Sequence, residues 1–563
     1  MTKPVIIGLA AALMSSGAVF AQQDTAAQPD SADQTGQQSA PADAQAGAAG
    51  GDADPAQTEM PDAAEADITP QDVGVESTAS DSDMTEMSAD TGADAADGAD
   101  AEEASGTTAA DTTEAADASG SDAAEMPETQ GASAQMADGA AGEAGPMVIV
   151  HAGTLLTNAA EAPLTEQSIV IRGDRIERIE AGYIEEDGAE IIDLSGGFVM
   201  PGMIDSHVHI TSELNPQQRL QTVERADGDY ALAGAVFGKR TLEAGFTTVQ
   251  DVGGRGTSAI YALRDASQDY DLPIPRIRAA GWSLSVTGGH GDGRQGYNED
   301  VAHVLHKDSV CDGADDCRRA VRDQIRKGAD LIKITATGGV LSNTLAGVEQ
   351  QFTDDELAAI VDAAGTMGRY VTAHAHGVNG INSALEAGVH SIEHGTYLDE
   401  ESIALFTEND AVLVPTVVAG DFVARTARTA TWMTEPQRIK SLQVGPQMLD
   451  MLRRAHQGGV TIAFGTDSGV SPHGENAREL ELMVEAGMSE QEVLEAATTT
   501  AAEHIQMAED IGTLEEGKFA DLIAVGGDPL QNISELRDVD FVMKGGRVFK
   551  EEDLDGPAAA GAD

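Results

Sequence analysis

The stretch from Phe198 to Ile210 reads FVMPGMIDSHVHI, an apolar run of strand type that ends in a pair of histidines. Side chains alternate between the two faces of a strand, so His207 and His209 point the same way. Two imidazoles on one face can bind one metal ion together. A His-x-His pair alone is weak evidence for a metal site, since a buried histidine more often has a structural role. Whether this pair binds metal has to be judged from the motifs elsewhere in the sequence.

Residues 200–508 continue this run with a regular alternation of strands and helices. Seven further apolar strand candidates are residues 246–250, 276–280, 331–335, 370–375, 390–394, 412–415 and 461–467. Helical patterns between them include residues 354–367, 379–387 and 437–456. Eight strand–helix units over about 300 residues predict an α/β fold with a closed, TIM-like (β/α)₈ barrel. A doubly wound open sheet is the alternative, but no Gly-rich phosphate loop follows the first strand.

Short strand patterns flank this central region on both sides. Before it, within residues 147–199, lie residues 148–150, 168–172 and 175–180; after it, within residues 509–550, lie residues 520–525, 541–543 and 547–549. Gly173-Asp174 and Gly545-Gly546 supply turns between neighbouring strands. These patterns predict a small composite β-sandwich domain built from both ends of the folded body.

The N-terminus has the layout of a secretory signal peptide over residues 1–21. Lys3 precedes an apolar run that begins at Val5, and small residues lead to a cleavage site after Ala21. A membrane anchor is the alternative, but the run is shorter than the ~20 residues that a bilayer requires. No later stretch is long and apolar enough either. We therefore expect export to the periplasm or the extracellular medium and no transmembrane span.

Residues 22–146 have a different composition, with 29 Asp and Glu and no Lys, Arg, His or aromatic residue. Such a segment cannot bury enough apolar surface to offset its conformational entropy, so we expect it to be disordered. Residues 551–563 are expected to be a flexible tail. The chain carries a net charge of −63, and the folded body keeps a large excess of acid. This argues against nucleic acid as a partner, which needs basic patches.

Two cysteines, Cys311 and Cys317, are separated by Asp-Gly-Ala-Asp-Asp. In an exported protein, two close cysteines form a disulfide more often than a metal site. We expect a small structural clip.

Ligand-type residues recur where the predicted barrel strands end, which is where barrel enzymes place their chemistry. A lysine inside an apolar strand, such as Lys333, is costly unless its charge is removed or paired. Carbamylation by carbon dioxide would turn Lys333 into an anionic carboxylate able to bridge two metals. The six ligands would be His207, His209, Lys333, one of His374 and His376, His394 and Asp467.

The ordered set of motifs resembles the amidohydrolase superfamily, and more narrowly its imidazolonepropionase-like and Xaa-Pro dipeptidase branch, which includes ochratoxin-hydrolysing amidases. The resemblance covers about residues 147–550. It rests on the segments MPGMIDSHVH at residues 200–209, GADLIKI at 328–334, HAHG at 374–377, EHG at 393–395 and GTD at 465–467.

The resemblance implies one metal held by His207, His209 and Asp467, and a second held by His374 and His394, with carbamylated Lys333 bridging both. His376 would then not bind metal directly, and could support the ligands or contact the substrate. The metals are most often zinc in this branch, and the nitrogen and oxygen ligands agree with that.

The activity implied is hydrolysis of an amide or peptide-type C–N bond in a dipeptide of Xaa-Pro type or an N-acyl amino acid. Two metals lower the pKa of a shared water so that hydroxide forms at working pH. Asp467 would accept its proton and deliver it to the departing amine. His290, in the Gly-rich loop TGGHGD at residues 287–292, His376 and Tyr397 are candidates for substrate contacts.

Two other functions stay open. A deaminase or a hydrolase of cyclic amides could use the same scaffold, although a single-metal deaminase does not need a bridging carboxylate at Lys333. A non-catalytic metal-binding protein is the other alternative, and the complete ligand set disfavours it. A small-molecule substrate is expected, and a homo-oligomer is left open.

Overall fold

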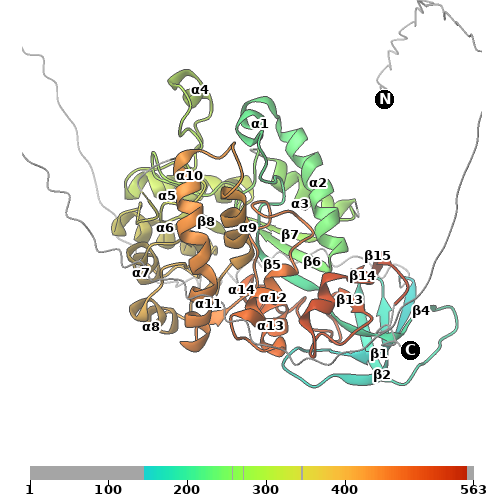
Figure 1. Ribbon diagram of the computed structural model, residues 1–563. Coiled ribbons are helices and arrows are strands. Elements are labelled where there is room, and N and C mark those ends of the chain that lie inside the picture. The colour runs from blue at the N-terminus through green and yellow to red at the C-terminus, as the bar shows by residue number, and fades with distance from the viewer. Residues whose placement is uncertain (1–144, 257, 271, 344–346, 555–563) are drawn as a thin grey trace, which may run out of the picture. The chain divides into compact units, whose positions relative to one another are not determined.

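The structure is a computed structural model that describes residues 145–554 apart from residues 257, 271 and 344–346 (Figure 1). The predicted signal peptide, residues 22–144 of the acidic segment and residues 555–563 of the tail lie outside the described residues. Within the described part of the chain, no helix combines the length and the apolar composition needed to cross a membrane.

Eight parallel strands build the central domain. They are β5 (Met203–Val208), β6 (Phe246–Asp251), β7 (Arg276–Ala279), β8 (Ile332–Thr335), β9 (Val371–Ala375), β10 (Ser391–His394), β11 (Val412–Val414) and β12 (Thr461–Ile462). Strands β5 to β7 pair in one group and β8 to β12 in another, each in sequence order. Buried apolar side chains from these strands and the surrounding helices form the largest hydrophobic core.

Backbone hydrogen bonds join the two groups of strands on both sides. Between β7 and β8, the amide of Leu284 donates to the carbonyl of Lys333 at 2.8 Å. Between β5 and the segment after β12, the amide of Asp467 donates to the carbonyl of His207 at 2.7 Å, and that of His209 to Ser468 at 2.7 Å. The eight strands therefore form the predicted (β/α)₈ barrel.

Helices follow most of the strands. They are α1 (Gln218–Glu224), α2 (Asp227–Glu243), α3 (Ala259–Asp269), α4 (Glu299–Val304), α5 (Ala314–Lys327), α6 (Asp354–Thr366), α7 (Val378–Glu386), α8 (Glu400–Glu408), α9 (Val417–Ala427), α10 (Glu435–Val444), α11 (Met448–Gln457), α12 (Arg478–Glu485), α13 (Glu490–Ala497) and α14 (Thr499–His504), with 3₁₀ turns η1 (Gly445–Gln447) and η2 (Ile533–Arg537).

The predicted helix over residues 437–456 is two helices. Helix α10 ends at Val444, η1 follows, and α11 begins at Met448. Pro446 is responsible, because proline has no N–H to donate and its ring clashes with the preceding turn of an α-helix. Beyond this break α11 buries Met448, Met451, Leu452 and Ala455, one face of a regular helix.

Seven strands from both ends of the folded body form a second sheet. They are β1 (Met147–Leu155), β2 (Leu164–Arg172), β3 (Arg175–Ala181), β4 (Glu190–Pro201), β13 (Leu522–Val525), β14 (Phe541–Lys544) and β15 (Arg547–Glu551). The order is β15-β14-β13-β4-β1-β2-β3, so the N-terminal and C-terminal strands lie side by side (cyan and red in Figure 1). This is one continuous sheet with its own hydrophobic core, and both chain ends contribute to it as predicted.

The single strand expected from Phe198 to Ile210 is two strands in different sheets. β4 ends at Pro201, which pairs with Leu522 of β13, and β5 begins at Met203, which pairs with Phe246 of β6. The chain changes sheets at Gly202, where a Cβ atom would lie 2.3 Å from the Thr247 hydroxyl oxygen. Only glycine fits at this crossing.

Candidate active site

The polar side chains singled out by the sequence converge on one cavity of about 380 Å³ at the carboxyl ends of the barrel strands. All six residues proposed as metal ligands line it, and so do His290 and His376. Tyr397 does not: its side chain is outside the cavity lining and the residue is 37% exposed. Tyr397 was a candidate because it lies only three residues after His394 in the sequence. The turn that follows β10 leaves its side chain outside the cavity lining.

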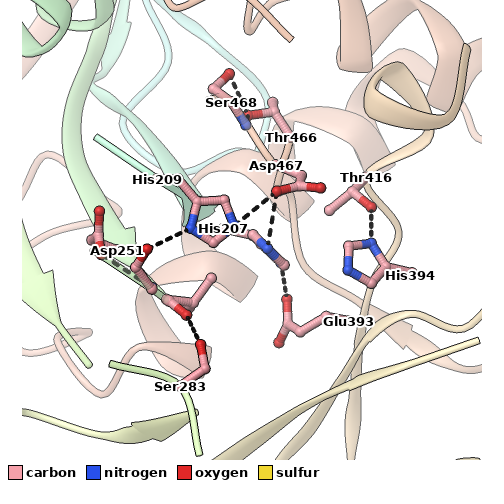
Figure 2. A network of polar contacts seen from close by, with 12 residues as sticks. His207, His209, Asp251, Ser283, Glu393, His394, Thr416, Thr466, Asp467 and Ser468 are labelled. Atoms are coloured by element: carbon pink, nitrogen blue, oxygen red, sulfur yellow. Dashed lines mark hydrogen bonds and ion pairs between the residues drawn. The ribbon is translucent and has the colours of Figure 1, made fainter. Parts of the chain in front are cut away.

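His207, His209 and Asp467 form the first cluster of ligand-type side chains (Figure 2). The Asp467 Oδ1 atom lies 3.0 Å from His209 Nε2 and 3.5 Å from His207 Nε2. The other nitrogen of each ring is already engaged: His209 Nδ1 donates to the carbonyl of Gly253 at 3.0 Å, and His207 Nδ1 donates to the Glu393 carboxylate at 2.6 Å. Both Nε2 atoms are thereby aimed at one point.

His374, His376 and His394 form the second cluster, and all three are buried. His394 Nδ1 is 2.7 Å from the Thr416 hydroxyl, and His376 Nδ1 is 2.8 Å from that of Thr396. The resemblance implied that His376 contacts the substrate or supports the ligands, and its ring centre lies 4.7 Å from that of His374 and 4.9 Å from that of His394. The rings of His207 and His394 are 5.1 Å apart, so the two clusters are neighbours.

Lys333 lies in the same cavity and is 3% exposed. Its Nζ atom is buried and has no hydrogen-bond partner among the described residues. Burial lowers the pKa of this lysine, against the opposing charges of Glu393 and Asp467. A lowered pKa increases the share of neutral amine, which is the form that reacts with carbon dioxide.

Burial also favours the neutral form of four of these histidines. It lowers the pKa of His290 to about 4 and that of His376 to about 3, and the pKa values of His374 and His394 lie well below the usual range for the same reason. A neutral imidazole keeps a lone pair on one nitrogen, which is the form that binds metal. Glu393 stays ionised beside them, because the charges of Lys333 and His207 lower its pKa to about 2 against the effect of burial.

Three residues at the site hold left-handed backbone conformations without being glycine. His394 has φ 73°, Thr416 φ 51° and Asp467 φ 56°. Such conformations cost energy in ordinary residues and cluster at functional sites. Strand β12 is shorter than predicted: it ends at Ile462, although the expected strand ran to residue 467.

Asp205 holds the two ends of the barrel together below the first cluster. Its carboxylate accepts hydrogen bonds from the Thr466 hydroxyl at 2.6 Å and from the Asn476 amide at 2.7 Å. It also accepts from the backbone amide of His207 at 3.1 Å. Asp205 and Asn476 carried no assigned role in the sequence, because their partners come from opposite ends of the barrel domain.

The donor set fits two divalent metal ions. In the first cluster, two Nε2 atoms and one carboxylate oxygen point at each other, an arrangement that only a proton or a metal ion between them can satisfy. His374 Nε2, Asp467 Oδ1 and Lys333 Nζ are buried without a hydrogen-bond partner among the described residues. Imidazole nitrogens and carboxylate oxygens are ligand types that divalent metal ions accept, so these residues fit such a site.

The loop between β7 and α5 forms one wall of the cavity. His290 lies in it, and its ring is 4.4 Å from that of His374. A disulfide joins Cys311, near the end of this loop, to Cys317, near the start of α5, with their Cα atoms 5.0 Å apart. The amide of Cys311 donates to the carbonyl of Ser285 at 2.9 Å, which joins the end of this loop to its beginning.

Known proteins share this sequence and fold. Residues 198–549 match the Amidohydrolase family. An ochratoxinase of Aspergillus niger is 33% identical over 372 residues, covering 62% of this chain and 75% of that protein.

Two solved structures cover 72% of this chain and 100% of their own. They are a Xaa-Pro dipeptidase with bound methionine in the active site, with a TM-score of 0.68 and 39% identity, and a prolidase complexed with N-methylphosphonate-L-proline, with a TM-score of 0.66 and 32% identity. The chain therefore belongs to the amidohydrolase family and is a hydrolase that acts on carbon–nitrogen bonds.

Proposed function

We propose that this protein is an exported binuclear amidohydrolase that cleaves the amide bond of an Xaa-Pro-like dipeptide or an N-acyl amino acid. The observation that carries the proposal is the meeting of two ligand clusters and Lys333 in one cavity. His207, His209 and Asp467 would hold one ion, most often Zn²⁺ in such sites, and His374 and His394 the other.

Lys333 would bridge the two ions after carbamylation. The neutral amine attacks carbon dioxide, an N–C bond forms, and one proton is released, which leaves an anionic carboxylate on the side chain. The buried position of Nζ and its lowered pKa favour the amine that this reaction needs. When bound, the metal pair would polarise the scissile carbonyl and lower the pKa of the attacking water.

Asp467 would move the proton. Its carboxylate lies at the edge of the first cluster and lines the cavity, so it can reach both the attacking water and the leaving nitrogen. It would accept a proton from the water and deliver it to the amine as the C–N bond breaks. Glu393 and Gly253 would keep His207 and His209 oriented throughout.

The substrate class is supported by two of the relatives with solved structures. A solved relative is a Xaa-Pro dipeptidase with bound methionine, and another is a prolidase complexed with a proline phosphonate. Export is supported by the signal-type N-terminus, and the disulfide agrees with an oxidising compartment.

The test is a parallel measurement of metal content and hydrolysis on the purified chain. We expect two equivalents of divalent metal, and release of free amino acid from Xaa-Pro dipeptides or N-acyl amino acids that chelation abolishes. His207→Ala combined with His209→Ala should lose metal and activity, whereas His303→Ala, an exposed histidine of α4, should lose neither. Full hydrolysis by the chelated protein would refute the proposal.

A further inference from the structure

Four cationic side chains line the cavity without an ion pair to a carboxylate of the described residues: Arg219, Arg255, Lys307 and Lys333. Lys333 lies with the ligand clusters, and Arg219 donates to the backbone carbonyls of Gln295 and Gly296, which leaves Arg255 and Lys307. We propose that they form an anion subsite that binds the carboxylate on the nitrogen side of the scissile amide. The inference rests on the proposed function, because Xaa-Pro dipeptides and N-acyl amino acids share that carboxylate. It makes the enzyme selective for substrates that release an amino acid.

The loop that carries Arg255 is fixed to the metal-ligand cluster. The carbonyl of Gly253 accepts from His209 Nδ1 at 3.0 Å, and the amide of Gly253 donates to the Asp251 carboxylate at 3.1 Å. Two residues later, the amide of Arg255 donates to the Thr211 hydroxyl, just beyond β5, at 2.7 Å. The arginine is therefore held beside the site by the same backbone that orients a ligand-type histidine.

Among the described residues, the guanidinium of Arg255 has one hydrogen-bond acceptor, the Thr222 hydroxyl. Its Nη1 donates to that hydroxyl at 3.2 Å, and the titratable groups that act on the pKa of Arg255 are the phenols of Tyr230 and Tyr297 rather than a carboxylate. Burial lowers the pKa of Arg255, but a guanidinium stays charged at any working pH. A planar fork of this kind matches a carboxylate.

Lys307 adds a second charge to the same wall. Its Nζ lies 4.5 Å from the ring centre of Trp282, which also lines the cavity. Burial, and then the charge of Arg255, lower the pKa of Lys307 to about 8, and only Asp292 opposes them. Asp292 is already engaged, since Arg294 donates to both of its oxygens at 2.7 Å.

Two neighbouring cations repel each other, and the repulsion is stronger where the cavity wall is partly shielded from water. A bound anion would reduce this electrostatic cost. The contrast with nearby lysines is direct. Lys440 donates to the carbonyls of Gly339 and Ser342, and Lys327 is paired with Asp323 at 2.6 Å. The chain has 96 acidic and 33 basic residues, so carboxylates are abundant as ion-pair partners. Two cations without such a partner in the cavity are therefore unexpected for this composition.

The experiment is a binding titration of the metal-loaded full chain, read by tryptophan fluorescence. Trp282 is one of two tryptophans, so Trp432→Phe isolates its signal. The probes are L-proline, L-methionine and L-phenylalanine, each compared with the amine that lacks its carboxylate. We expect each amino acid to bind more tightly than its amine. In Arg255→Met or Lys307→Met, the ratio of the two dissociation constants should fall by about tenfold or more.

Lys327→Met is the matched control, because Lys327 also approaches the Trp282 ring, at 5.7 Å, but is already paired. It should leave both affinities unchanged, and Arg255→Lys should restore part of the advantage. Equal weakening of acid and amine in the methionine variants would overturn the subsite, as would undiminished binding of the acids. Tighter binding of inorganic phosphate than of any amino acid would overturn its assignment to a carboxylate.

Binding and turnover separate the two proposals. If amino acids outbind their amines through Arg255 and Lys307 while no amide is hydrolysed, the subsite stands and the proposed function fails. If amides are hydrolysed with equal KM whether or not they carry the carboxylate, the proposed function stands and the subsite fails.

Discussion

Lys333 is a buried amine that faces two clusters of metal-ligand type. If both clusters hold a divalent cation as proposed, an unmodified ammonium at Lys333 would be strongly repelled in so poorly solvated a site. Lys333→Ala should therefore lose at least one metal equivalent and nearly all activity, and short carboxylic acids should partly restore both by occupying the vacated space. Metal analysis with and without added acetate, alongside the turnover rate, measures this.

Lys333→Arg is the control for charge, because its guanidinium cannot be carbamylated and stays charged. No rescue is expected there. Two bound metals and full activity in the alanine variant would contradict the bridging role.

Asp467 combines a ligand position with a place on the cavity wall. Asp467→Asn keeps an oxygen donor but cannot accept the proton, so metal content should persist while kcat falls by ~10²–10⁴-fold. Asp421→Asn, on the outer surface of α9, should leave kcat unchanged. Near-normal turnover in metal-loaded Asp467→Asn would remove the proton-transfer role.

Among individual residues, the sequence predicted those whose role can be inferred from the strand that carries them. His207, His209, Lys333 and His394 follow apolar runs, so their positions in the cavity could be expected. Glu393 was visible next to His394, but its partner His207 is remote in sequence. Arg255 lies in a loop with no periodic pattern, so nothing before the structure distinguished it from a solvated arginine.

At the scale of elements, the connection between β7 and α5 depends on its disulfide. Replacing both cysteines by serine should lower the free energy of unfolding by roughly 2 kcal/mol, the usual effect of closing so short a loop. Thermal melting of the wild type with and without dithiothreitol measures it. The double variant should not respond to the reductant, and an unchanged melting temperature in the reduced wild type would contradict a structural role.

Element boundaries were harder to predict than element types. The run from Phe198 to Ile210 is apolar throughout, so nothing in its hydrophobic pattern reveals the change of sheet at Gly202. The helix over residues 437–456 kept a helical pattern on both sides of Pro446. In both places one residue, Gly202 or Pro446, changes the course of the backbone. The hydrophobic pattern of the residues around it does not show this.

At the scale of the whole molecule, the acidic segment should be dispensable for catalysis. It contains no histidine and no aromatic residue, and residues after 144 already supply both ligand clusters. Deleting residues 22–145 behind an intact signal should leave kcat and KM nearly unchanged. Steady-state kinetics of the two purified proteins compares them, and a large loss of activity in soluble, folded protein would show that the segment contacts the site.

The sequence predicted the architecture well because the alternation of strands and helices is long and regular. Eight units in order leave few topologies, and the right-handed βα connections favour closure. The β domain was foreseeable because turn-bounded strands occur at both ends. Its joining into one sheet through β4 and β13 was not, because pairing between distant strands leaves no local trace.

That pairing between β4 and β13 constrains how the protein is made. The ribosome synthesises β4 before the entire barrel and β13 only after it, so β4 leaves the tunnel with one edge unpaired. The backbone bonds of His207 and His209 likewise wait for the segment around Asp467. Synthesis from the N-terminus therefore completes neither domain early, and a chain truncated before Leu522 lacks the strand that covers this edge.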